Sequence, residues 1–409
     1  MTGKSNGLLG AAIACALFGS TVHASMDDLT EALTSGKAYG DLRLRYETVD
    51  QDNALSDASG LTLRTRLGYK TGEISGFSST IEFEDSRTIA GVDEYELPGP
   101  ARDADYLVNN KSVIADPETT ELDQAFLQYS SDTFGAKFGS QVITLDNHRY
   151  VGHVGWRQDR QTFDAATLSF TPDDKVKIDF AYITERNRIF AAEADIKAKD
   201  KLFNASYKTP FGKATVYGYF LSQDNGTKLD IDTRGARFSG KQALEDLDLL
   251  YTLEYASQDR KNASGKQDTD YKLLELGAKV SGVTAKLGYE SLGSDGGSYG
   301  FSTPLATGHK FNGWSDQFLG TPGVGLDDVY VSVSGKLAGG KWLLAYHDFS
   351  ANQGSAAVDD LGSEVDVLYA KKFGKNYSAG VKYAAYSAGD QAAGKVDTDK
   401  MWVWVGAKF

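Results

Sequence analysis

The sequence predicts an all-β chain that forms a transmembrane antiparallel β-barrel of about eighteen strands. Three observations lead to this prediction. Apolar and polar residues alternate with a period of two along most of the chain, as in strands with one face in lipid. The connections between these stretches are alternately short and long. The last strand ends on an aromatic residue, and one face of it carries Met401, Val403, Val405, Ala407 and Phe409.

The beginning of the chain has the composition of a cleaved signal peptide, predicted over residues 1–24. Lys4 precedes an apolar run at 8–18, and small residues at 22–24 suit a cleavage site. The run is shorter than the ~20 residues that a spanning helix needs. Cys15, the only cysteine, lies inside this run, so a lipoprotein is the alternative. Cleavage would leave a chain without disulfides or thiolate-bound metal.

The rest of the chain limits the possible cellular locations and binding partners of the protein. No later stretch of ~18 uninterrupted apolar residues exists that could form a membrane helix. The net charge of −13 argues against nucleic acid as a partner. We therefore predict a protein of the bacterial cell outer membrane, surrounded by lipid and lipopolysaccharide. The barrel-assembly machinery would recognise its C-terminal residue, Phe409.

The predicted elements follow in order. Residues 25–37 form a short periplasmic segment with helical character, and residues 38–409 form the barrel. The expected strands are 38–49, 60–71, 76–86, 121–131, 134–142, 160–171, 175–186, 199–209, 212–223, 229–240, 246–259, 268–281, 283–293, 326–338, 340–350, 362–374, 376–388 and 398–409.

The layout of the connections orients this barrel. Short turns are expected in the periplasm and long loops outside the cell, the longest at 87–120, 143–159 and 294–325. An even strand count places both termini in the periplasm. Sixteen strands is the alternative count, and a soluble sandwich is the alternative architecture. Because closure removes the exposed edges of such a sheet, the barrel is favoured, and a monomer is expected.

Catalytic motifs are missing from the sequence. It contains no His-Glu-x-x-His, Gly-x-Ser-x-Gly or phosphate-binding loop. His347-Asp348 could be imagined in a barrel enzyme of the lipase type, but a polar pair at a strand end is the favoured interpretation. The acidic stretch 116–123 could bind Ca²⁺ through its oxygen ligands. It lacks the ligand spacing and central glycine of an EF-hand, which favours solvated carboxylates or contact with divalent ions that bridge lipopolysaccharide. We predict no enzyme, no cofactor and no bound metal.

Arginines on two adjacent predicted strands form the clearest cluster of candidate functional residues. In a barrel, these side chains face the lumen, because a charge on the lipid face costs about 2–4 kcal/mol at the midplane. A cationic ladder suits carboxylate or phosphate groups. Alternatively, these charges pair across the barrel and only fill it, and a pore can combine both roles. The members are Arg43, Arg45, Arg64 and Arg66.

The loop at 143–159 and the residues just after it contain the second cluster of candidate functional residues. Trp156 offers a face for a sugar ring, and arginines suit its carboxylates. The loop could fold into the lumen or pack on the extracellular rim, and the sequence does not decide between these. Its candidate pore residues are Arg149, Trp156, Arg157 and Arg160.

Several segments resemble the alginate-export family of outer-membrane porins. They include 41–50, 61–68, 115–124, Gly155-Trp-Arg-Gln158, Gln161-Thr-Phe-Asp164, 309–314 and the closing strand. The resemblance implies an eighteen-strand barrel with an arginine-lined, anion-preferring pore. It implies pore roles for Arg43, Arg64, Arg149, Arg157 and Asp164. The chain departs from many relatives at Ser140, where they have arginine, and it is shorter than expected of a dedicated exporter.

We therefore predict a porin for passive diffusion of small anionic solutes, such as uronates or acidic oligosaccharides. An alginate or exopolysaccharide secretion pore is the alternative of the same class, and a lipase-like barrel enzyme is the alternative of another class. A pore for apolar substrates conflicts with the arginine rows. The direction of transport, and whether loop 143–159 or loop 294–325 constricts the pore, stay open.

Overall fold

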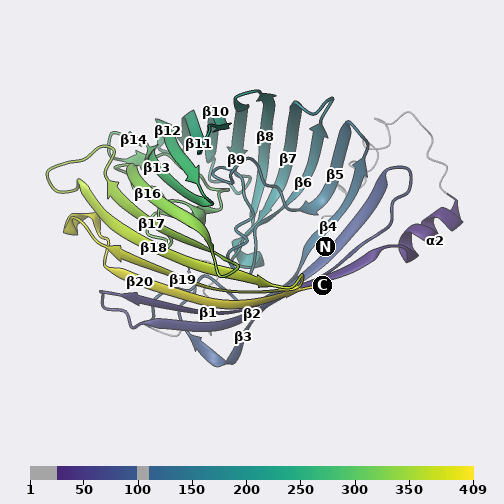
Figure 1. Cartoon of the computed structure of the whole chain (residues 1–409), viewed down its shortest axis with the longest axis horizontal. Coiled ribbons are helices and arrows are strands. Elements are labelled where there is room, and N and C mark those ends of the chain that lie inside the picture. Colours follow the sequence, from purple (N-terminus) through teal and green to yellow (C-terminus); the bar gives the residue numbers. More distant parts are fainter. Residues whose placement is uncertain (1–24, 99–109) are drawn as a thin grey trace.

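The computed structural model describes residues 25–98 and 110–409, and the predicted signal peptide lies outside these ranges. Eighteen antiparallel strands form one sheet that closes on itself. Closure occurs where β1 (Lys37–Gln51) pairs with both β2 (Ala58–Lys70) and β20 (Thr398–Lys408). Figure 1 shows the resulting ring, with the first strands beside the last. The strand count is therefore eighteen and not sixteen.

The other strands of the barrel pair in chain order. They are β3 (Phe77–Glu94), β4 (Thr119–Ser130), β5 (Phe134–Gln141), β6 (Thr162–Phe170), β7 (Val176–Asn187), β8 (Ile196–Thr209), β9 (Gly212–Ser222), β10 (Asp230–Ala243), β11 (Asp248–Asn262), β12 (Gly265–Val280), β13 (Val283–Leu292), β16 (Leu326–Leu337), β17 (Gly340–Ser350), β18 (Asp360–Phe373) and β19 (Tyr377–Ser387). The predicted strands agree closely, except that β3 continues to Glu94 instead of ending at residue 86.

Several short elements lie outside the barrel wall. The small hairpin of β14 (Ser294–Asp295) and β15 (Tyr299–Gly300) was not predicted. Single 3-10 turns occur at Ala192–Ala194, Gly308–Lys310 and Gln391–Ala393. Helix α2 (Met26–Thr34) begins with a capping box in which the Ser25 hydroxyl accepts from the amide of Asp28. None of the described helices is long and apolar enough to cross a membrane.

The strands present one apolar and one polar face. On β3, the Phe83 side chain is 52% exposed, whereas its neighbour Glu84 is fully buried. Leu67 and Val405 continue the exposed apolar band on β2 and β20. Such a band suits lipid, and it assigns the opposite face, with its charged residues, to the lumen.

The two ends of the barrel differ as the sequence predicted. One end carries short turns, such as 131–133, 210–211 and 281–282, and we call it the short-turn end. The other carries long loops, including 142–161 and 293–325, and we call it the long-loop end. Helix α2 lies at the short-turn end, because the Gly72 amide donates to the Ala32 carbonyl at 2.8 Å.

The backbone conformation at one position of the barrel wall requires a glycine. Gly139 on β5 has a φ of +124°, and a Cβ built there would overlap the Ala125 carbonyl and lie 3.0 Å from Cα of Phe126 on β4. Glycine alone adopts this conformation without strain. On the same strand, a Cβ built on Gly135 would lie 3.8 Å from its nearest neighbouring atom, which is an ordinary contact.

We expect Gly139→Ala to lower the free energy of unfolding by about 1–3 kcal/mol, since it combines backbone strain with a clash against β4. Urea unfolding followed by loss of the heat-resistant folded band on gels measures this. Gly135→Ala is the matched control and should change stability by less than about 0.5 kcal/mol. Equal effects of the two substitutions would contradict the description of the β4–β5 pairing.

Candidate functional site

The two arginine rows lie side by side on the lumen face. Arg43 on β1 is directly opposite Arg64 on β2 in the strand register, and Arg66 is opposite Asp41. Like charges directly opposite each other are destabilising, so neighbouring groups must offset them. The Arg64 guanidinium pairs with Asp41 at 2.7 Å, and Arg66 pairs with Glu84 on β3.

Arg45, the most deeply buried of the four arginines, binds carboxylates from two parts of the chain. It is fully buried and pairs with Glu47 at 3.2 Å on its own strand. It also pairs with Asp116, which lies in the connection before β4. Carboxylates on the same or the adjacent strand, and in the connection before β4, therefore neutralise Arg45 and Arg66.

Arg43 differs because its recorded partners are neutral oxygens. Within the described chain, its guanidinium donates to the carbonyls of Trp156 at 2.7 Å and Arg157 at 2.6 Å, and to Gln158 Oε1 at 3.0 Å. Arg43 lies near the middle of β1, on the lumen face. The 142–161 loop therefore folds into the barrel and does not pack on the rim.

Buried ion pairs hold this loop against separate parts of the wall. Arg157 binds Glu47 on β1 at 3.0 Å, and Arg149 binds Glu290 on β13 at 3.0 Å. All four side chains are nearly inaccessible to solvent. Arg160 pairs with Glu82 and Asp123 on β3 and β4. Since a buried charge is stable only with a partner, these contacts fix the loop across the lumen.

The 293–325 loop packs against the 142–161 loop inside the barrel. The Gly152 amide donates to the Leu305 carbonyl at 2.8 Å, and the Thr307 amide donates to the His148 carbonyl at 3.1 Å. Val151, Phe301 and Leu305 are at most 1% exposed and belong to one apolar cluster with residues of the wall. The two loops therefore share a small hydrophobic core within the lumen.

Trp156 sits where the two loops meet the wall. Its ring stacks on His309 of the 293–325 loop, with centroids 5.1 Å apart. The Lys382 amine on β19 lies 4.5 Å from the Trp156 ring and 3.7 Å from the Trp314 ring, in the geometry of a cation–π contact. Burial lowers the pKa of His309 to about 3, so its ring is neutral beside the Lys382 amine.

A cationic cavity of about 350 Å³ lies on the short-turn side of the 142–161 loop. Its charged lining consists of five cations and one carboxylate, and a tryptophan contributes to its surface. Burial and the nearby Arg160 lower the pKa of His153 to about 4, so arginine and lysine alone supply the positive charge at neutral pH. The lining includes Asp41, Arg43, Arg64, Arg66, His153, Arg160, Trp404 and Lys408.

Of the nine predicted site residues, the cavity is lined by Arg43, Arg64, Arg66 and Arg160. Arg45, Trp156 and Arg157 instead bind the wall or the neighbouring loops, and Asp164 and Arg149 lie apart from the cavity. Asp164 on β6 accepts from the Ser140 hydroxyl at 2.6 Å, and Arg149 lies at β13. Lys408 and Trp404 were missed as cavity residues because only barrel closure places β20 beside β1. The imagined His347-Asp348 pair is split between two faces: His347 bonds to Asp328 at 3.0 Å, and Asp348 is exposed.

The closed eighteen-strand barrel has the fold of solved bacterial outer-membrane porins. OpdK of Pseudomonas aeruginosa, solved with vanillate, superposes with a TM-score of 0.72 at 14% identity, covering 92% of this chain and 99% of that one. OccK9 of the same organism gives 0.72 at 14% identity, with 92% and 100% covered. OccAB1 of Acinetobacter baumannii gives 0.72 at 13% identity, with 92% and 97% covered.

The sequence itself identifies the family. The alginate export family model matches residues 37–294, well over half of the chain, and this protein belongs to that family. No curated protein sequence matched it. The solved structures share the fold at low identity, so the residues of this chain alone indicate its solutes.

We expect Arg157→Met to release the 142–161 loop from Glu47 and Asp316. Removing one partner of a buried pair should lower the free energy of unfolding by about 3–5 kcal/mol, measured by urea unfolding. The single-channel current should become larger and noisier. Arg234→Met is the control, because Arg234 is 52% exposed and its surface pairs should contribute less than about 1 kcal/mol. Identical stability and current in both variants would contradict this role of Arg157.

Proposed function

We propose that this protein is a porin for passive diffusion of small anionic solutes, with uronates and acidic oligosaccharides as the solute class. The observation that supports this most directly is the cationic cavity, where five cations and one carboxylate surround about 350 Å³ of space. A positively lined passage raises the local concentration of anions and favours their entry. No covalent step or energy input is required.

Individual residues would have distinct roles in this mechanism. Arg43 and Arg64 line the cavity, and their guanidiniums suit a solute carboxylate. Among the arginines that line the cavity, Arg43 has neutral recorded partners, so an anion would complete its charge balance. Trp404 could support a pyranose ring. Arg45, Arg149, Arg157 and Trp156 would instead hold the loop that sets the aperture.

Small solutes fit this interior better than a polymer does. The two loops cross the lumen and are fixed by buried ion pairs. The cationic cavity, and a second cavity of about 350 Å³ beside Lys137 and Lys177, are each of a size for small molecules. Secretion of alginate or another exopolysaccharide would require both loops to move aside, so it is the second candidate. A lipase-like enzyme gains no support from the separated His347 and Asp348.

Several sequence predictions complete this proposal. The signal peptide over 1–24, the periplasmic position of 25–37, the monomeric state and the recognition of Phe409 by the assembly machinery stay predictions. The pore role of Asp164, which accepts a hydrogen bond from Ser140 away from the cavity, also stays a prediction.

We expect reversal potentials in a KCl gradient to show a channel that favours chloride. Arg43→Gln with Arg64→Gln should reduce the chloride preference severalfold, because two cavity charges are lost. Arg234→Gln, an exposed arginine outside the cavity, should leave it unchanged. Liposome swelling should be faster with glucuronate than with glucose for the wild type. This difference should be lost in the variant that carries both Arg43→Gln and Arg64→Gln. A cation-selective wild-type channel would overturn the proposal.

A further inference from the structure

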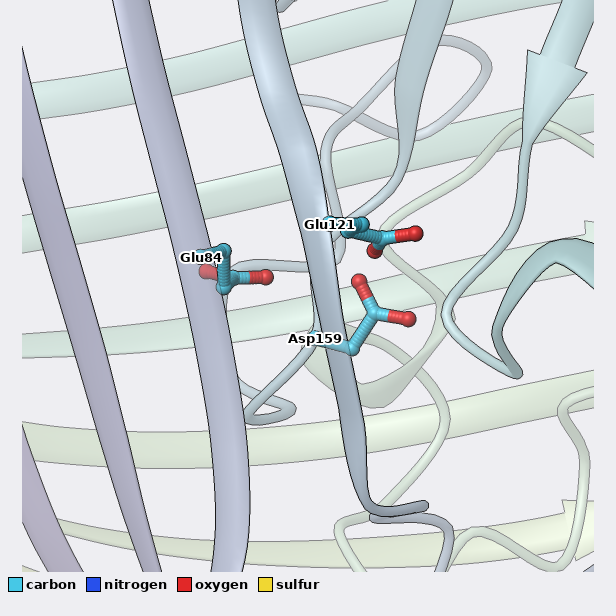
Figure 2. A group of neighbouring side chains, drawn as sticks. All are labelled: Glu84, Glu121 and Asp159. Atoms are coloured by element: carbon cyan, nitrogen blue, oxygen red, sulfur yellow. The ribbon is translucent and has the colours of Figure 1, made fainter.

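Three acidic side chains converge beside the end of the 142–161 loop. They come from separate elements: Glu84 from β3, Glu121 from β4 and Asp159 from the loop. One carboxylate oxygen of each lies within 4.8 Å of the others. Figure 2 shows the carboxylate of Asp159 facing that of Glu121, with Glu84 directed toward both. Glu121 belongs to the acidic stretch 116–123, for which the sequence favoured solvated carboxylates or contact with ions that bridge lipopolysaccharide.

Asp159 provides an independent sign that a ligand is missing from this group. Its side chain is fully buried, and its Oδ1 has no hydrogen-bond partner among the described residues. The other oxygen, Oδ2, receives only a long contact of 3.4 Å from the Ala191 amide. Buried carboxylates are normally paired or coordinate a metal, because burying an unpaired charge is costly.

With all three carboxylates ionised, the local charges are unbalanced by two. Glu84 pairs with Arg66, whereas no cation pairs with Glu121 or Asp159 among the recorded ion pairs of the described chain. The nearby Arg160 side chain is already bound to Glu82 and Asp123. Three carboxylates and one guanidinium therefore leave a deficit that one divalent cation would neutralise.

The spacing of the oxygens favours calcium. When three atoms lie within 4.8 Å of one another, one point can lie within about 2.8 Å of all three, near the ~2.3–2.6 Å of Ca²⁺–oxygen bonds. Mg²⁺ demands shorter bonds of about 2.0–2.1 Å and a stricter geometry. Glu121 is half-buried, so water could complete the coordination from its side.

We propose that Glu84, Glu121 and Asp159 form a Ca²⁺ site that ties the 142–161 loop to β3 and β4. Asp159 lies two residues after Arg157, which holds the loop to β1. A bound ion would add to the attachment that Arg160 already makes to β3 and β4 at the end of the same loop. Divalent cations would thereby set how firmly the loop stays in the lumen. The site does not depend on which solutes the channel carries.

The test uses the full barrel, refolded in detergent without lipopolysaccharide, stripped with a chelator and titrated calorimetrically with CaCl₂. We expect one site per chain with a Kd of about 10⁻⁴–10⁻³ M, as in extracellular modules, and weaker binding of Mg²⁺. Asp159→Asn and Glu121→Gln should each weaken Ca²⁺ binding about tenfold or more. Asp268→Asn, an exposed acid near Lys266, is the matched control and should bind as the wild type does.

Folding of each variant is checked by the heat-resistant band on gels. If Asp159→Asn does not fold, the half-buried Glu121→Gln decides the outcome. Addition of a chelator should also make the wild-type single-channel current noisier, and this effect should be absent in Glu121→Gln. A folded wild type that binds no Ca²⁺ at millimolar concentration overturns the proposal. Binding that is unchanged in every folded variant overturns it equally.

Discussion

Pairing of the first strand with the last is the constraint on which the rest of this structure depends. A strand in lipid has no water to satisfy its backbone, so only a closed sheet can cross the membrane. Here the whole length of β20 pairs with β1, from Asp41 with Lys408 to Gln51 with Thr398. Closure then forces every strand to divide its side chains between lipid and lumen, as Phe83 and Glu84 do.

The lumen, once closed, must accommodate many charges in a small space. Arg43 faces Arg64 across one strand pair, and this arrangement is stable only because other groups approach from the interior. Asp41 and Glu84 supply part of the balance from the wall. The 142–161 loop supplies carbonyl oxygens to Arg43 and takes Glu47 as the partner of Arg157. The loop and the arginine rows thus stabilise each other, and the cavity beneath them keeps an excess of positive charge.

The sequence predicted the barrel wall almost completely and its interior only in part. Strand positions could be predicted because alternation of lipid-facing and lumen-facing residues is a local pattern. Arg43 and Arg157 could be selected from residue type and from family resemblance. Their partners could not, since contacts such as Arg45 with Asp116 and Arg157 with Asp316 join segments far apart in the chain.

The partners of the acidic stretch 116–123 could not be predicted from the sequence either. Its carboxylates looked equivalent in the sequence, yet Asp116 binds a buried arginine and Glu121 joins Glu84 and Asp159. Asp116 and Glu121 have different neighbours only because the 142–161 loop folds into the lumen. The position of the 142–161 loop inside the barrel is therefore the central claim, since the cavity, the aperture and the acidic cluster all follow from it.

Cross-linking tests that claim most directly. Gln158 of the loop donates to the Thr62 hydroxyl of β2 at 2.8 Å, so cysteines at both positions should lie within reach of a short bifunctional thiol reagent. In a barrel that also carries Cys15→Ser, we expect rapid cross-linking in the folded state and a quieter single-channel current afterwards. Failure of the folded barrel to cross-link, while each single cysteine still reacts, would contradict a loop held within the lumen.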